Sequence, residues 1–199
     1  MRKYFFFLFL FLCLACGPNL KEVEVKNEMG QVIERYTQNP KTALKEGKNY
    51  LYNDDGSVQA ESDYKQGKID GERKLFYPSG QVEAIERYED GQFEGVFQSY
   101  YKNGQLKLEG IYTNNEMGGS WKRYYESGAL MEEVTFKQNA ENGPFIEYYE
   151  NGNLKAQGAY LEGDNEHGEL KLFDEHGEHV KTMDCKVGRC LTTWKKTET

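Results

Sequence analysis

Residues 95–118 read GVFQSYYKNGQLKLEGIYTNNEMG, and this stretch is one copy of a repeat that runs through most of the chain. Each copy opens on a glycine, and the opening glycines follow one another every 24 residues, with one interval of 25. They are Gly47, Gly71, Gly95, Gly119, Gly143 and Gly168. Because a fixed period of this length is the signature of a repeat architecture, the repeat decides the fold.

Two turns divide each copy. Nine residues after the opening glycine a second glycine follows turn-forming residues, as in Lys102-Asn103-Gly104. A type I turn closed by a glycine with positive φ is a common three-residue hairpin loop, so the chain folds back at this point. After the turn, apolar and polar residues alternate, as in Leu154-Lys155-Ala156, which predicts a strand with one buried face. A second turn, such as Glu89-Asp90-Gly91, leads to the next copy.

Each copy is therefore one β-hairpin, and the predicted fold is all-β: an elongated single antiparallel β-meander of six repeated hairpins over residues 47–190. About twelve strands at roughly 4.8 Å each would extend over about 60 Å. We expect a signal peptide at 1–15, a tether with a degenerate first hairpin at 16–46, and a tail at 191–199. One thin sheet buries little surface, which agrees with a mean hydropathy of −0.84.

The N-terminus carries an export signal. Residues 1–16 read MRKYFFFLFLFLCLAC, with two basic residues, an apolar run and a small residue before Cys16. The run is shorter than the roughly 20 residues that span a bilayer as a helix. Leu14-Ala15-Cys16 resembles a bacterial lipobox, although Cys13 stands where Leu is usual. The resemblance implies cleavage before Cys16 and lipid attachment to it, with plain secretion or an uncleaved anchor as alternatives.

The expected location is the bacterial cell envelope. Gly17, rather than Asp, follows the cysteine, and by resemblance to enterobacterial sorting this permits export to the outer membrane. The membrane is then a partner only through the N-terminal lipid, and the periplasmic and surface faces both stay open. The formal net charge of −8 leaves no basic surface for a phosphate backbone, so nucleic acid is not an expected partner.

No pattern of catalytic residues stands out. The chain has no Ser-His-Asp set with a nucleophile elbow and no phosphate-binding loop, so we expect neither an enzyme nor a cofactor. His167, His176 and His179 lie close together beside acidic residues, which could bind a divalent ion. His176 occupies a turn position, however, and a solvated turn residue is the favoured interpretation. No metal site is predicted.

The unit Gly-x4-aromatic-Tyr-x2-Gly-x-Leu/Val-x5-Tyr-x2-Gly closely resembles the MORN-repeat variant, in its bacterial branch of YwqK-like antitoxins, here in a lipoprotein form. The resemblance covers residues from about Gly47 to Gly188. It implies the hairpin-repeat fold and an interaction role, because members of the wider MORN group act as scaffolds. An antitoxin role fits an exported, lipid-anchored chain poorly.

A row of tyrosines is the candidate ligand-facing surface. It consists of the second ring in four copies: Tyr77, Tyr101, Tyr125 and Tyr149. Equivalent strands two ladder steps apart would space these rings over about 29 Å. A tyrosine offers a flat apolar ring and a polar tip, so the row could bind an extended peptide or a glycan. The alternative, which we favour, is that the rings brace neighbouring strands.

Cys185 and Cys190 are the only other cysteines of the mature chain besides Cys16. A pair of cysteines in an oxidising compartment predicts a disulfide, which would staple the last turn. Metal or redox chemistry is the alternative, although Cys-x4-Cys is an unusual zinc spacing.

These observations favour a non-catalytic scaffold: an envelope-anchored lipoprotein that presents a repetitive β surface to an unknown protein or glycan. An alternative is an inhibitor, in the sense of an antitoxin or immunity protein, of a secreted or periplasmic toxin. A hydrolase or metal enzyme built on the three histidines is a third, weaker hypothesis.

Overall fold

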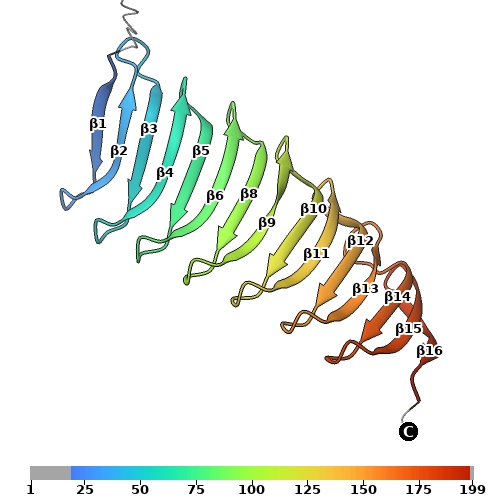
Figure 1. Ribbon diagram of the computed structural model, residues 1–199. Coiled ribbons are helices and arrows are strands. Elements are labelled where there is room, and N and C mark those ends of the chain that lie inside the picture. The colour runs from blue at the N-terminus through green and yellow to red at the C-terminus, as the bar shows by residue number, and fades with distance from the viewer. Residues whose placement is uncertain (1–18, 198–199) are drawn as a thin grey trace, which may run out of the picture.

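The structure is a computed structural model that describes residues 19–197. Over this range the chain forms one antiparallel sheet of 16 strands, and the strands follow one another across the sheet in chain order (Figure 1). Short β7 lies off this path and pairs with β6. The strands are β1 (Lys21–Lys26), β2 (Val32–Gln38), β3 (Lys45–Tyr52), β4 (Val58–Lys65), β5 (Lys68–Phe76), β6 (Val82–Glu89), β7 (Gln92–Phe93), β8 (Gly95–Tyr100), β9 (Leu106–Thr113), β10 (Glu116–Tyr124), β11 (Leu130–Lys137), β12 (Ala140–Tyr148), β13 (Leu154–Tyr160), β14 (Gly168–Phe173), β15 (His179–Lys186) and β16 (Arg189–Lys195).

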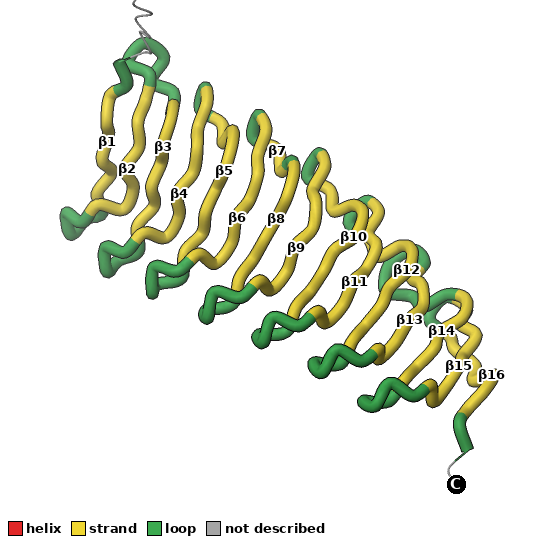
Figure 2. Tube along the Cα trace, viewed as in Figure 1, coloured by secondary structure: helices red, strands yellow, loops and turns green. Residues whose placement is uncertain are grey.

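The sheet is an open single layer with turns along two long edges (Figure 2). At one edge, which we name the long-turn edge, each turn is closed by the same two backbone hydrogen bonds, such as Tyr77 N to Gln81 O and Gly80 N to Tyr77 O. The equivalent turns span residues 27–31, 53–57, 77–81, 101–105, 125–129, 149–153 and 174–178. The predicted all-β hairpin meander and its three-residue turns are therefore confirmed.

The opposite edge, the short-turn edge, carries two-residue turns in which both residues have positive φ. They are Gln66-Gly67, Asp90-Gly91, Asn114-Asn115, Gln138-Asn139 and Val187-Gly188. Two positive φ values define a type I′ turn, whose twist matches that of the flanking strands. Asn115 and Asn139 stand where the other turns have glycine, in keeping with the tolerance of asparagine for this conformation.

The opening glycine of each repeat forms a bulge. Around Gly71, Ser62 pairs with Arg73 and Tyr64 with Ile69, so three residues oppose Asp63 alone. Gly71 has a φ of +121°, and a Cβ atom there would lie 3.1 Å from the Cβ atom of Asp63. Both the positive φ and the close approach require glycine, which explains why the repeat begins with it.

A second bulge, beside each long turn, breaks the strict alternation that the sequence predicts. Leu75 pairs with Ala84 and Phe76 pairs with Val82, so Glu83 has no partner in the ladder. The same shift recurs in the equivalent hairpins. Two-residue periodicity therefore does not run unbroken from the turn into the strand.

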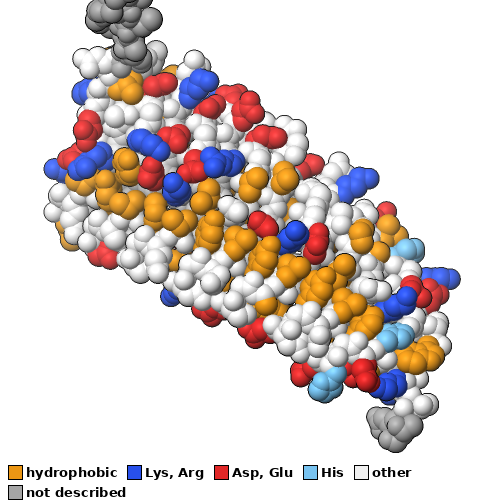
Figure 3. Space-filling model, in the orientation of Figure 1, with side chains coloured by type: hydrophobic (Ala, Val, Ile, Leu, Met, Phe, Trp, Pro, Cys, Tyr) orange, Lys and Arg blue, Asp and Glu red, His pale blue; other side chains and the backbone are white. Residues whose placement is uncertain are grey.

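One face of the sheet holds the buried side chains, and we name it the packed face. Its most buried residues towards the C-terminal end are Trp121, Val134, Phe145, Ala156, Leu170 and Cys185. Towards the N-terminal end the buried residues include the polar Asn49, Ser62 and Glu86. Figure 3 shows a band of hydrophobic side chains along the length of one face, with charged side chains on both sides of it.

The sheet extends beyond the six repeats at both ends. A hairpin of β1 and β2 precedes the repeats, and the irregular segment after it covers residues 39–44. At the C-terminal end, β16 continues to Lys195, into the residues that the sequence suggested as a tail. The turn at Val187-Gly188 folds this extra strand back onto β15, so the strands outnumber the twelve expected for six hairpins.

Val187 is a strained residue, because a β-branched side chain disfavours its φ of +50°. Its side chain is 57% exposed, so its replacement removes little packing. We expect Val187→Asn to raise the free energy of unfolding by about 1 kcal/mol, since asparagine tolerates this conformation. Urea unfolding under oxidising conditions measures the change.

Val96 is the matched control, since it is an exposed valine inside β8. Val96→Asn should not stabilise the protein. Equal effects of the two substitutions would contradict the strain at Val187.

Candidate functional site

The four predicted tyrosines lie at the long-turn edge, where each begins a turn. Each hydroxyl donates a hydrogen bond to a backbone carbonyl oxygen of the following repeat. The bonds join Tyr77 to Tyr100 (2.7 Å), Tyr101 to Tyr124 (2.7 Å), Tyr125 to Tyr148 (2.9 Å) and Tyr149 to Phe173 (3.0 Å). The row therefore connects successive repeats, 23 or 24 residues apart in the chain.

These contacts define what the row can offer to a ligand. The four rings are half-buried, and their hydroxyls already have partners within the chain. Burial raises the pKa of Tyr77, and the charge of Glu83 adds to this effect. Lys107 Nζ lies 5.7 Å from the centre of the Tyr101 ring. A ligand at the row would meet the exposed part of each ring rather than a free hydroxyl.

The first repeat departs from this pattern. Asn53 begins its long turn in place of a tyrosine, and its amide donates to Ser57 Oγ at 3.0 Å. A hollow of about 430 Å³ lies beside Asn53, lined by Gln59, Ala60, Arg73, Leu75, Phe76, Pro78 and Glu83. The equivalent hollow beside Tyr125 has only about 180 Å³. The row of tyrosine rings thus begins one repeat after this open hollow.

A set of charged residues crosses the packed face over β10 to β13. Glu132 and Glu147 face each other directly on β11 and β12. Lys155 Nζ lies 2.8 Å from a Glu147 carboxylate oxygen, and an Arg123 guanidinium nitrogen lies 3.7 Å from Glu132. Like charges directly opposite on a sheet are destabilising, so these two cations offset a repulsion that the register creates.

The pKa values of this set follow from burial. Burial raises the pKa of Glu132, the Glu147 charge adds to the rise, and Arg123 acts against it. Burial and the charge of Glu132 raise the pKa of Glu141. The pKa of Tyr160 is raised as well, first by burial and then by the surrounding carboxylates. This part of the packed face therefore has an excess of negative charge and favours cationic groups.

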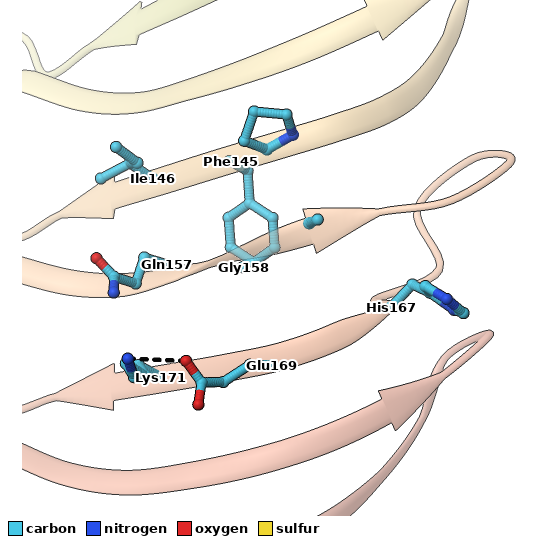
Figure 4. Close-up of a pocket in the computed structure, with 9 residues that line it drawn as sticks. Phe145, Ile146, Gln157, Gly158, His167, Glu169 and Lys171 are labelled. Atoms are coloured by element: carbon cyan, nitrogen blue, oxygen red, sulfur yellow. Dashed lines mark ion pairs between the residues drawn. The ribbon is translucent and has the colours of Figure 1, made fainter.

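A further hollow of about 380 Å³ lies over β12, β13 and β14 (Figure 4). Lys171 and Glu169 form an ion pair of 2.7 Å there, and His167 lies at the other end of the hollow, apart from this pair. The ladder between β13 and β14 is short because the chain between them carries the longer connection at Leu161–His167. The arrangement does not bring His167 to a nucleophile.

The other histidines have structural contacts. The ring of His179 stacks on Trp194 at 4.5 Å, and Thr182 Oγ1 lies 2.9 Å from its Nε2 atom. His176 lies in the turn at residues 174–178. Over residues 19–197 the structure contains no group of three or more His, Cys, Asp or Glu side chains placed to hold a metal ion.

The last turn contains the cysteine pair. Cys185 and Cys190 form a disulfide between β15 and β16, with their Cα atoms 4.0 Å apart. Cys185 is almost completely buried beside Leu170 and Phe145 in the apolar cluster of the packed face. The disulfide therefore joins the final strand to the core.

The predicted lipid attachment site, Cys16, lies outside the described residues. Within residues 19–197 there is no helix with the length and apolar character needed to cross a membrane.

The fold and the contacts between repeats define a class of protein: an open, single-layer sheet of hairpin repeats that are linked along both edges. Four tandem segments, at residues 69–90, 93–114, 117–138 and 141–162, match the family of MORN repeat variants. Residues 69–162 therefore contain four tandem matches to the MORN repeat variant. The narrower resemblance to YwqK-like antitoxins and the lipoprotein form stay predictions.

No curated protein matches the sequence significantly. Among solved structures, a chain of the GtfA/B complex bound to UDP and GlcNAc is similar at 14% identity, with a TM-score of 0.25. The match covers 54% of this chain and 21% of that chain.

Two features of the candidate site escape sequence reasoning. Asn53 is of a residue type that is ordinary in turns. Only the alignment of the repeats shows that it occupies the position where four later repeats have a tyrosine. The opposition of Glu132 and Glu147 depends on the register across two bulged strands, so alternation alone gives no signal of it.

The tyrosine hydrogen bonds predict a stability difference. Tyr101→Phe keeps the ring and removes only the bond to the Tyr124 carbonyl oxygen, so we expect it to lower the free energy of unfolding by about 1 kcal/mol. Urea unfolding measures the loss.

Tyr112 serves as the control, because its hydroxyl has no hydrogen-bond partner among the described residues. Tyr112→Phe should change stability little. A loss at Tyr112 as large as that at Tyr101 would show that the hydroxyl contact between repeats does not matter.

The raised pKa of Glu132 predicts a pH dependence. Its folded-state pKa lies above the ordinary 4.5, so its contribution favours folding at low pH and is lost as the pH rises through the folded pKa. Glu132→Gln should therefore raise the free energy of unfolding at pH 7 by up to about 1 kcal/mol, the scale of a cross-strand charge repulsion. The gain should shrink at about pH 3, which lies below the pKa of this carboxyl in both the folded and the unfolded state.

Chemical unfolding of both forms at the two pH values tests this. Glu126→Gln, in an exposed turn, controls for the removal of one negative charge from the chain. A gain from Glu132→Gln that is larger under the acidic condition than under the neutral one would contradict a raised pKa in the folded state.

Proposed function

We propose that this protein is a lipoprotein of the bacterial cell envelope, anchored in the outer membrane through Cys16, and that its repeat sheet is a non-catalytic scaffold for a protein or glycan partner. The observation that carries the proposal is the single open layer, in which every repeat presents side chains on both faces and along two edges. A sheet of this form has much surface for its mass, as extended repeat proteins that bind partners do.

The side chains along the sheet support an interaction role. The packed face changes along its length from polar residues, such as Asn49 and Glu86, to apolar ones, such as Trp121 and Phe145. Half-buried tyrosine rings follow the long-turn edge. Rings and charges in one extended surface are suited to recognition of a polymer with repeating contacts, such as a peptide segment or a glycan.

The anchoring proposal predicts the loss of a lipid label. In Cys16→Ser the attachment atom is absent, so the chain should lose incorporation of labelled palmitate. Cys13→Leu is the control, because it introduces the residue usual at that lipobox position and should keep the label. Incorporation of labelled palmitate that persists in Cys16→Ser would contradict lipid attachment at this residue.

Photo-crosslinking in cells tests the scaffold role. Crosslinkers placed at the exposed positions Val25, Val96 and Leu191, on β1, β8 and β16, sample three separate regions of the sheet. We expect the same partner to be captured from more than one of these positions. Crosslinks confined to the chain itself at every position would contradict the scaffold role.

The inhibitor alternative stays a separate prediction. It requires a toxin-like gene in the neighbourhood whose expression is lethal without this chain, and co-expression of the two genes decides between the roles.

A further inference from the structure

We propose that the hollow beside Asn53 is a binding site for a tyrosine side chain of a basic partner peptide. The inference rests on the proposed scaffold role and gives it a specific subsite. The chain itself shows what fills this position, because four later repeats place their own tyrosine there.

The hollow beside Asn53 is equivalent to the hollow beside Tyr125, three repeats further along the chain, where a tyrosine of the chain itself lies. Gln59, Ala60, Leu75, Phe76 and Glu83 in the first correspond, 72 residues later, to Met131, Glu132, Glu147, Tyr148 and Lys155 around Tyr125. The space is about 430 Å³ beside Asn53 and about 180 Å³ beside Tyr125. A smaller residue at the start of the turn and a small Ala60 on the floor together account for the larger volume.

A hydrogen-bond acceptor for the incoming hydroxyl is in place. Each row tyrosine donates to the carbonyl oxygen of the aromatic residue that precedes the next long turn, as Tyr77 does to Tyr100. For the turn that begins at Asn53, this residue is Phe76. No side chain between residues 19 and 197 donates to the Phe76 carbonyl oxygen, and Asn53 bonds to Ser57 instead.

The lining is also suited to a ring. Ala60, Leu75, Phe76 and Pro78 supply apolar contact, and the hollow extends the tyrosine row by one position towards the N-terminal end. A tyrosine from outside would thus continue an existing line of contacts between repeats. It would bury its ring and satisfy its hydroxyl in the same way.

Charge selects among tyrosine-bearing partners. Glu83 lines the hollow and forms no ion pair with any described residue, whereas Arg73 lies 3.4 Å from Glu86 and so already has a partner. The net charge of the chain is −8. A lysine or arginine next to the bound tyrosine would therefore be attracted both by Glu83 and by the protein as a whole.

The test is a ligand-observed saturation-transfer titration of the full chain in detergent with an end-blocked Lys-Tyr dipeptide. We expect saturable binding that weakens at least tenfold in Asn53→Tyr, because the variant fills the hollow from within. Lys-Phe, which lacks the hydroxyl, should bind about fivefold more weakly, equivalent to one hydrogen bond. Glu83→Gln should weaken Lys-Tyr binding about twofold to fivefold.

One further measurement keeps the result decisive. Asn53→Tyr should raise the melting temperature, because its ring fills the hollow as the other row rings fill theirs. No saturable binding to the wild type, equal binding to Asn53→Tyr, or a lower melting temperature for Asn53→Tyr would overturn the site.

Failure of this site and failure of the scaffold role are distinguishable. If crosslinking captures a partner and the dipeptide does not bind, the site is wrong and the scaffold stands. If the dipeptide binds and no partner is captured in cells, the site stands and the scaffold role is wrong.

Discussion

Positive φ at three points in every 24 residues is the constraint on which the rest of the structure depends. Sixteen of the 21 glycines occupy these points, and all sixteen have positive φ. One makes the bulge at the start of the repeat, one closes the long turn and one completes the short turn. Because a one-residue slip would turn every side chain to the other face, these fixed points set the register that assembles the packed face.

A single layer has no second sheet to pack against, so cohesion comes from contacts between neighbouring repeats. On the long-turn edge the tyrosine hydroxyls reach forward by 23 or 24 residues. On the short-turn edge, backbone amides reach back by 22, as from Gly91 to Ile69. Each repeat is thus fixed at both ends to the next, and stability is a sum of nearest-neighbour terms.

The fold could be predicted from the sequence because its period, its glycines and its turn residues are all local signals. The candidate site could be predicted only in part. The register of Tyr77, Tyr101, Tyr125 and Tyr149 is visible in the sequence, but the partner of each hydroxyl lies a whole repeat away and becomes apparent only once the strands are aligned. Similarly, the bulge at Glu83 cannot be read from alternation, and it is this bulge that brings Glu83 to the hollow beside Asn53.

Identical backbones with different side chains give the sheet its capacity for selective recognition. The position occupied by Ala60 in the first repeat is taken by Ala84, Leu108, Glu132 and Ala156 in later ones, in the same register. At this position a ligand would meet a small apolar floor near the N-terminal end and a carboxylate beyond the middle of the sheet. Since the spacing of these positions is constant, a partner whose own contacts repeat at the same distance would meet several of them at once. The side chain at each position would then determine which partner binds.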